Sequence, residues 1–356
     1  MNKIFLYKIF FSVTSSAKRI EMLINFKQWI YKFVLILNVV VCSSLEAQTF
    51  EVEQIEQLFR PRVRVDSKYI VDASFKDTTG VYNQKEISSV FTFPIKTKFS
   101  ADVKLDLSSL KLKDILKNSV RIKASQTLGV FRLNARQINI GFDTLPQKNI
   151  INATGGLMGL RLTKKYRVQF YSATVTIAEQ DKTLNSASPR ISALFGQLHL
   201  RGLKRNFFYG IAATYSDGLI LPAPFFGGSE PIGKYFVFNY TLPVQVNLQY
   251  KDDKKTLITI GAGLDGYRNG ILYLTKRKNL NYYAGLTYAN FRYKFSKSFV
   301  GRVECGYIFY QGLRYSKTEG SVTKFGLNPS PYVQVGFSVL FGKTFWEKVF
   351  DNVIKN

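Results

Sequence analysis

Histidine is the side chain that most often serves as a general acid or base near neutral pH, and this chain has a single one, His199. Lipase-type or protease-type chemistry would need a serine or an aspartate held against the imidazole. Nothing in the sequence places such a partner beside it. We therefore expect His199 to be an ordinary polar residue facing the interior of the fold, with ligand contact and catalysis as weaker alternatives.

The motifs of cofactor and metal sites are missing as well. The chain contains no HExxH, no CxxC, no GxxxxGK and no acidic calcium loop. Gly261, Gly263 and Gly266 match GxGxxG, but the surrounding pattern is that of a strand and its turn, whereas a nucleotide site needs a strand-to-helix junction. The sequence predicts no enzyme, no cofactor and no metal site.

Basic side chains at alternate positions of several expected strands are the first candidates for function. If they line a pore, rings of lysine and arginine favour anions. Two alternatives stay open, because opposite charges on neighbouring strands can pair into a packed network, and residues beyond the bilayer can contact lipid phosphates. The candidate lumen residues are Arg62, Arg64, Lys68, Lys96, Lys98, Lys104, Arg121, Lys123, Arg167, Arg201 and Arg302.

The second candidate is the segment 217–233, which we expect to be a long external loop. Its prolines would stiffen it, and its pair of glycines would permit a sharp reversal. The loop could fold into the mouth of a barrel and narrow it, or form a rigid cap over the strand ends. Its candidate constriction residues are Asp217, Pro222, Pro224, Phe225, Phe226, Gly227 and Gly228.

The elements that position these side chains are expected to be β-strands. From Phe91 to Leu107 apolar or small residues occupy every second position, with charged or polar residues between them from Lys96 on. Side chains alternate faces along a strand, so one face is apolar and the other wet. We predict about twelve strands, near 62–75, 91–107, 120–140, 150–162, 165–178, 190–202, 206–216, 235–250, 256–266, 281–294, 299–310 and 331–341.

About twelve such strands after an export signal are typical of a transmembrane antiparallel β-barrel, which in bacteria has short periplasmic turns and long external loops. The expected turns near 164, 204–206, 251–255 and 296–298 are short, and the expected loops at 179–189, 217–233, 267–280 and 311–330 are long. Only 108–118 is long for a turn. A soluble β-sandwich or lipocalin-like barrel is the alternative, since alternation occurs in any half-buried sheet.

The ends of the chain complete the predicted domain organisation. Residues 1–47 have the basic start, short apolar run and small-residue end of a signal peptide, with Met22 as an alternative start. Residues 48–60 would form a periplasmic segment and 61–342 the barrel. The apolar spacing in 343–356 predicts an amphipathic helix at the membrane interface, or a helix that plugs the barrel end.

The net charge of +26 favours anionic partners. An exported chain rarely meets nucleic acid, so we expect outer-membrane lipid, lipopolysaccharide and small anionic solutes as partners, and no nucleic acid. The oligomeric state is left open.

Several short motifs are distinctive: Tyr215 to Gly218, Leu221 to Gly228, Asn239 to Val244, Leu264 to Tyr267, and the ending from Pro331-Tyr332 to Leu340-Phe341-Gly342. On these motifs the chain resembles a family of outer-membrane barrels of Gram-negative bacteria, known as domain of unknown function 6268. The resemblance implies a barrel in the outer membrane of a Gram-negative bacterium. It brings no reaction, ligand or catalytic residue.

Together these observations predict passive passage of small, anionic solutes through a narrow lumen. The alternative is a closed structural or interaction barrel whose external loops bind a partner or lipopolysaccharide.

Overall fold

The computed structural model is all-β in the residues that it describes, which are 62–103, 120–141, 147–163, 167–180, 188–200, 205–216, 219–250, 255–273, 276–296, 298–316 and 322–341. The predicted signal peptide, the periplasmic segment 48–60, the long turn at 108–118 and the C-terminal helix at 343–356 lie outside these ranges.

Fifteen strands form one antiparallel sheet. They are β1 (Arg62–Ser74), β2 (Val81–Val103), β3 (Val120–Ile140), β4 (Gln147–Thr163), β5 (Arg167–Gln180), β6 (Ser188–Leu200), β7 (Asn206–Ser216), β8 (Leu219–Ile232), β9 (Phe236–Leu242), β10 (Gln245–Tyr250), β11 (Thr256–Tyr273), β12 (Lys276–Lys294), β13 (Phe299–Ser316), β14 (Val322–Leu327) and β15 (Ser330–Leu340).

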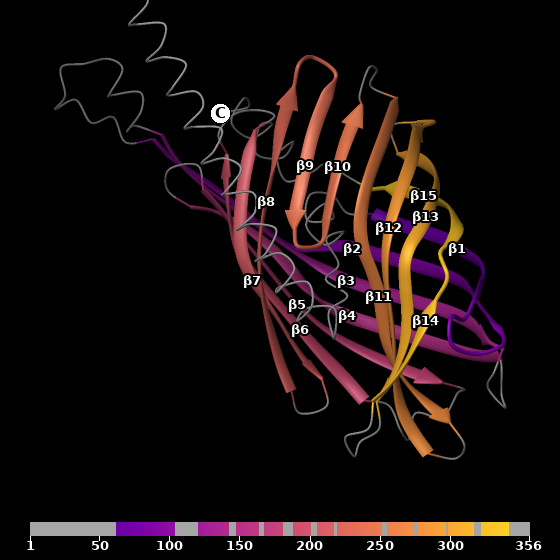
Figure 1. The fold of residues 1–356 in the computed structure, drawn as a ribbon. Helices are drawn as coiled ribbons and strands as arrows, with labels where there is room; N and C mark the ends of the chain where they lie inside the picture. The colour runs from indigo at the N-terminus through magenta and orange to yellow at the C-terminus, as the bar shows by residue number, and fades with distance from the viewer. Residues whose placement is uncertain are drawn as a thin grey trace, which may run out of the picture. The chain divides into compact units, whose positions relative to one another are not determined.

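The sheet closes on itself into a barrel (Figure 1). Each strand from β1 to β13 pairs with the next, β15 joins β13 to β1, and within the described chain this ring has 14 members. β14 stands outside the ring and pairs with the last residues of β13, directly before β15. An even strand number lets both ends of the barrel chain emerge on the same side, as single-chain bacterial barrels require.

The connections β4–β5, β6–β7, β8–β9, β10–β11 and β12–β13 lie at one end of the barrel, which we name the turn end and which the sequence predicts to be periplasmic. β1 starts and β15 finishes there. The opposite end is named the loop end. The turns predicted near 164, 204–206, 251–255 and 296–298 all fall between strands at the turn end, so this part of the prediction agrees with the strand bounds.

The predicted number of about twelve strands is wrong, because the segment 217–250 holds three strands where we expected one. Leu219–Ile232 of the expected external loop 217–233 form β8, Asp217 lies outside the described residues, and the expected single strand 235–250 is the hairpin of β9 and β10. The connection between β9 and β10 is a tight turn at Pro243 and Val244, which places Thr241 opposite Gln245. Three residues, Leu242 to Val244, separate this pair, and an offset of four keeps residues of equal parity on one face, so period-two patterning cannot distinguish one long strand from this hairpin.

The expected loops 267–280 and 311–330 are also largely strand. β11 continues to Tyr273 and β12 begins at Lys276, with unbroken pairing from Thr256 opposite Tyr293 to Tyr273 opposite Lys276. The segment Arg268-Asn269-Gly270 has the composition of a turn, but the ladder to β12 keeps it extended. Pairing with the full length of β12 therefore keeps this segment in a strand despite its turn-like composition.

Bulges change the faces that the sequence predicted for two strands. In β2, Pro94 pairs with Leu128 and Lys96 with Thr127, so the extra residue Ile95 shifts the phase of everything after it. A similar shift after Ile70 in β1 turns Ala73 inward. The run from Phe91 to Leu107 is therefore regular in sequence but does not keep one face throughout.

The outer face of the barrel is apolar over a broad band. Exposed apolar residues pair across neighbouring strands, as in Phe91 with Phe131, and in the row Phe291, Val303 and Val335. Soluble proteins rarely expose contiguous apolar patches of more than a few hundred Å². This band disfavours the soluble sandwich or lipocalin-like alternative. Among the described residues, no helix is long and apolar enough to cross a membrane.

Candidate functional site

The basic candidates divide between the two faces of the wall. Arg64 and Lys68 lie on the inner face of β1, Arg62 shares that face, and Arg302 lies on the inner face of β13. Lys96 and Lys98 are exposed and share the outer face with Thr127, because the bulge at Ile95 reverses their orientation. Their predicted place in the lumen is wrong.

Arg167 is also exposed on the outer face, since it alternates with the buried Val168 and Phe170 and shares the parity of the exposed Tyr171. It was predicted inside because the inner face of β5 is itself apolar. The side chains of Arg121 and Lys123, and residues Lys104 and Arg201, lie outside the described part of the structure.

Four inward basic residues pair with three acids, because Arg64 and Arg302 share one carboxylate. The Asp66 carboxylate accepts hydrogen bonds from the Nε of Arg64 and the Nε of Arg302, and all three side chains are buried. On the neighbouring wall Arg136 donates to Glu86 at 3.0 Å. A ring of lysines and arginines favours anions only when its charge is not cancelled. These ion pairs offset part of the positive charge on the inner face, and anion selectivity stays a prediction.

Other contacts join walls that are not neighbours. The ammonium of Lys68 on β1 pairs with Asp265 on β11, although β15, β13 and β12 lie between them along the wall. Strands are about 4.8 Å apart, so this ion pair crosses the interior. Tyr82 of β2 reaches Tyr267 of β11 in the same way, with 3.1 Å between the hydroxyl oxygens.

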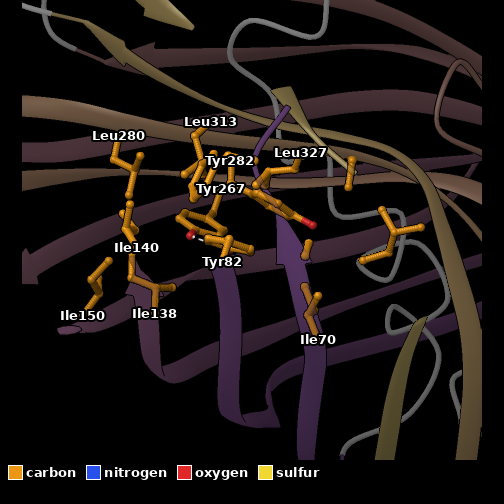
Figure 2. Close-up of a cluster of buried hydrophobic side chains, with 14 of the residues drawn as sticks. Ile70, Tyr82, Ile138, Ile140, Ile150, Tyr267, Leu280, Tyr282, Leu313 and Leu327 are labelled. Carbon is orange, nitrogen blue, oxygen red and sulfur yellow. Dashed lines mark hydrogen bonds between the residues drawn. The ribbon is translucent and has the colours of Figure 1, made fainter. Parts of the chain in front are cut away.

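Three tyrosines form the centre of this crossing (Figure 2). The ring of Tyr282 stacks on Tyr82 at 5.4 Å and on Tyr267 at 5.3 Å between centroids. The guanidinium of Arg136 lies 3.9 Å from the centroid of Tyr267, a distance suited to a cation–π contact. Apolar side chains surround the stack towards the loop end: Ile70, Ile138, Ile140, Ile150, Ile271, Leu280, Leu313 and Leu327. We name this set the upper cluster; it fills the interior near the loop end.

β11 itself contributes to the closure of the loop end. Its Cα atoms come within 8 Å of those of β5, although β6 to β10 lie between the two strands along the wall. On β6, Arg190 donates a hydrogen bond of 3.3 Å to the backbone carbonyl of Arg268 on β11. The loop-end half of β11 has thus left the circumference and lies across the interior.

The wall is interrupted where β11 bends away. β9 has seven residues and β10 has six, whereas β8 has 14 and β11 has 18. β9 pairs with Phe226–Ile232 of β8, and β10 pairs with Ile258–Gly263 of β11. Figure 1 shows the β9–β10 hairpin stopping part-way along its two neighbours. We name the break between Leu219–Phe225 of β8 and Leu264–Tyr273 of β11 the lateral notch.

Two of the predicted loop residues lie on the rim of the lateral notch. Pro222 and Pro224 pair with Ala213 and Ile211 of β7, on the stretch of β8 beyond the β9 ladder. Proline lacks an N–H donor and is tolerated in a sheet where that edge has no partner strand. The prolines thus suit an open edge. Their expected role in a folded-in constriction loop is wrong.

Aromatic rings cover the inner wall beside the lateral notch. Phe225 of β8, Phe208 of β7 and Phe170 of β5 are buried, with centroids 6.0 to 6.4 Å apart. We name these three residues the phenylalanine triad. Each ring lies over a glycine of an adjacent strand: Phe225 over Gly210, Phe208 over Gly227 and Phe170 over Gly196. A side chain on any of these glycines would occupy the space of the ring.

The apolar lining continues from the phenylalanine triad around the wall from β3 to β7. Leu128 and Val130 are buried on this inner face. The inner face of β8 is apolar too, which is why the sequence does not reveal this strand. On β8 the inner residues Leu221, Ala223 and Phe225 are as apolar as the outer residues Ile220, Pro222 and Phe226, so no alternation marks the strand. Its three prolines and two glycines also disfavour a strand, so neither alternation nor propensity marks β8 in the sequence.

His199 does not face the interior as expected. It pairs with the exposed Arg167 and shares the outer face with Gln197, while Leu198 between them is buried inside. Its ring stacks on Tyr209 at 5.6 Å, and Tyr209 donates to Gln197 at 2.9 Å. No serine or carboxylate contact to the imidazole is seen among the described residues, and these residues contain no group of ligands that could hold a metal ion.

No family model and no curated protein matches the chain, so the resemblance to domain of unknown function 6268 stays a prediction. Among solved structures, the COG4313 outer membrane channel from Pseudomonas putida F1 is similar, with a TM-score of 0.37, 11% identity, and coverage of 79% of this chain and 96% of that chain. The transport unit of the autotransporter AIDA-I from Escherichia coli gives 0.35 and 7%, over 87% and 97% of the two chains. A mutant of the monoaromatic hydrocarbon channel TodX gives 0.36 and 6%, over 80% and 90%. At such TM-scores the likeness carries no argument about function, which has to come from the barrel itself.

Proposed function

We propose that this protein is a barrel of the outer membrane of a Gram-negative bacterium that lets small solutes pass through its interior. Two features support the membrane location: the apolar outer band, and turns that are short at one end only. The turn end then faces the periplasm and the loop end faces outward.

The observation that carries passage is a set of buried polar atoms on the inner face that have no hydrogen-bond partner in the described protein. Gln126 on β3 has neither its side-chain oxygen nor its nitrogen satisfied, and the same holds for Asn269 on β11. The hydroxyl of Thr259, also on β11, is a third case. A purely structural core satisfies nearly all of its buried polar groups. Such groups at different heights fit an interior that takes up water and small polar parts of solutes.

The upper cluster and the tyrosine stack would act as the gate of this passage. Among the described residues, the polar contacts that cross the interior include the Lys68–Asp265 ion pair and the Tyr82–Tyr267 hydrogen bond. They join walls that have no ladder in common, so breaking them need not break a strand pairing. The second candidate function is a closed structural barrel. The buried Arg64–Asp66–Arg302 network favours it, because paired charges away from water are typical of a rigid, filled interior.

Single-channel recording of Asp265→Asn in a planar bilayer tests the gate. The substitution keeps the side-chain volume and removes the charge that holds Lys68, so we expect open steps to be more frequent than in the wild type. Asp72→Asn is the matched control, because Asp72 is exposed and bonded only to Asn83 among the contacts that the structure shows. Silence from both wild type and Asp265→Asn, in samples shown to be folded, would leave the closed structural barrel as the function.

A further inference from the structure

We propose that the lateral notch is a route by which small apolar solutes, of the hydrocarbon or simple aromatic class, move between the membrane and the interior of the barrel. This inference rests on the proposed passage function and names the substrate class and entrance of that passage.

The height of the wall places the lateral notch within the membrane. A strand needs about 9 to 11 residues to cross the bilayer. β9 and β10, with seven and six residues, are too short to do so, while β8 and β11 on either side are long enough. Since the hairpin begins at the turn end, the missing part of the wall lies in the half of the membrane nearer the loop end.

The chemistry of the rim fits lipid on one side and an apolar solute on the other. On the outer face Ile220 is 68% exposed and Phe226 is 40% exposed. On the inner face of the same stretch lie Leu221 and Ala223, which lead to Phe225 of the phenylalanine triad. The apolar surface is therefore continuous from the outside to the inside across the open edge. A polar solute would lose its hydration there without gaining a partner.

A strand from a second chain is the main alternative occupant of the open edge, and the prolines of β8 prevent it from pairing there. An exposed strand edge is a template for pairing with another strand, and proteins block it with proline. Pro222 and Pro224 are two residues apart, so their missing donors fall on the same edge of β8. Because the other edge is engaged by β7, the edge without donors is the one that borders the lateral notch.

In the described part of the chain, the interior behind the lateral notch is closed towards the loop end. Towards the loop end the way is closed by the inward bend of β11 against β5 and by the upper cluster. Towards the turn end lies the phenylalanine triad, and next to it along the wall Ser229, Asn239 and Asn247 of β8, β9 and β10 are hydrogen-bonded in a row. The route therefore runs from the membrane, past the phenylalanine triad, to the periplasmic side. Flat aromatic or short alkyl solutes suit a lining of flat rings.

Photolabelling of the barrel in phospholipid nanodiscs with a small aromatic diazirine, 3-trifluoromethyl-3-phenyldiazirine, tests the route. Labelled residues are mapped by mass spectrometry. We expect label on Phe225, Phe208 or Leu221 of the inner face as well as on the outer band, and loss of only the inner label when excess toluene is added. Label confined to the outer face would overturn the proposal. Inner label that toluene does not displace would also overturn it, because a lipid chain or a second protein copy would then occupy the site.

Ala223→Trp places a bulky ring at the inner side of the lateral notch and is expected to lower the inner label about tenfold, the range typical of a lost apolar contact. Ala193→Trp is the matched control, because Ala193 is exposed on the outer face of β6. If Ala223→Trp does not fold, Leu221→Gln replaces it, since a polar side chain there disfavours apolar solutes with little change of volume.

The photolabelling result and the conductance of the proposed passage are independent readouts. Open steps in the bilayer without inner label would retain a passage and overturn its apolar lateral entrance. Inner label that toluene displaces, in a barrel without open steps, would support the lateral entrance and overturn the ion-permeable passage.

Discussion

Replacing Asp66 by alanine is expected to lower the unfolding free energy of the barrel by about 3–5 kcal/mol, the cost of breaking a buried ion pair by removal of one partner. The carboxylate bridges Arg64 of its own strand and Arg302 of β13, which donates at 2.7 Å. The Asp66 side chain is 2% exposed, and those of the two arginines 8% and 9%. Two buried guanidinium groups would thus be left without that acid.

Urea unfolding of the refolded barrel in detergent micelles, followed by the mobility difference between folded and unfolded forms on a gel, measures this change. Asp72→Ala is the control, because it removes the same group from the exposed end of the same strand. Equal midpoints for the two variants would contradict a structural role for the network.

A second variant approaches the same network through the backbone. Gly336 on β15 lies opposite Asp66, and a methyl group there would overlap the carboxylate and lie 2.9 Å from the carbonyl oxygen of Val65. Gly336→Ala should therefore weaken the network without removing a charge. We expect it to lower the urea midpoint in the same assay, by less than Asp66→Ala.

The other large effect is expected at the glycines beneath the phenylalanine triad. Gly210→Val would bring a side chain onto the ring of Phe225 and the carbonyl oxygen of Phe195, and to 2.8 Å from the Cα of Gly196. The ring can rotate, but the two backbone atoms belong to the neighbouring strand and cannot move without disturbing the ladder. Overpacking of this kind costs about 3 kcal/mol or more, so we expect the variant to lose most of its folded fraction.

Gly155→Val is the matched control for Gly210→Val. It makes the same substitution within a strand of the same barrel, at a position where an added Cβ would meet nothing within 4 Å. Valine favours strands, so this control is expected to fold as well as the wild type or better. Loss of folding in both variants would mean that glycine is needed for reasons other than the ring above it.

Alternation of faces allowed the sequence to predict strands wherever the two sides of the wall differ in polarity. On β1 the sequence predicts Arg64 and Lys68 in the lumen, and the structure has both on the inner face. In 235–250 the prediction of one strand is wrong, because the three-residue connection from Leu242 to Val244 leaves the alternation of faces undisturbed.

The predicted strands or faces are wrong where both faces of a strand are apolar or where a bulge shifts the alternation. Phe225 and Pro224 lie on opposite faces of β8, yet neither is polar. Because polarity does not alternate here, the sequence predicts a loop instead of a strand. Lys96 was assigned to the lumen because one extra residue, Ile95, cannot be recognised from alternation alone. Strand pairing to a neighbour reveals such residues, and pairing partners are not visible in a single sequence.

By itself, then, the sequence determined the class of fold, an antiparallel barrel with a polar and an apolar side, because period-two patterning depends only on the local geometry of a strand. Only the tertiary structure decided what the interior is. Whether Asp66 lies between Arg64 and Arg302, whether Lys68 reaches Asp265, and whether β11 leaves the wall depend on which strands meet across the barrel. These contacts join residues as far apart in sequence as Asp66 and Arg302. Strand register and strand length bring such residues together, and neither can be derived from the local pattern.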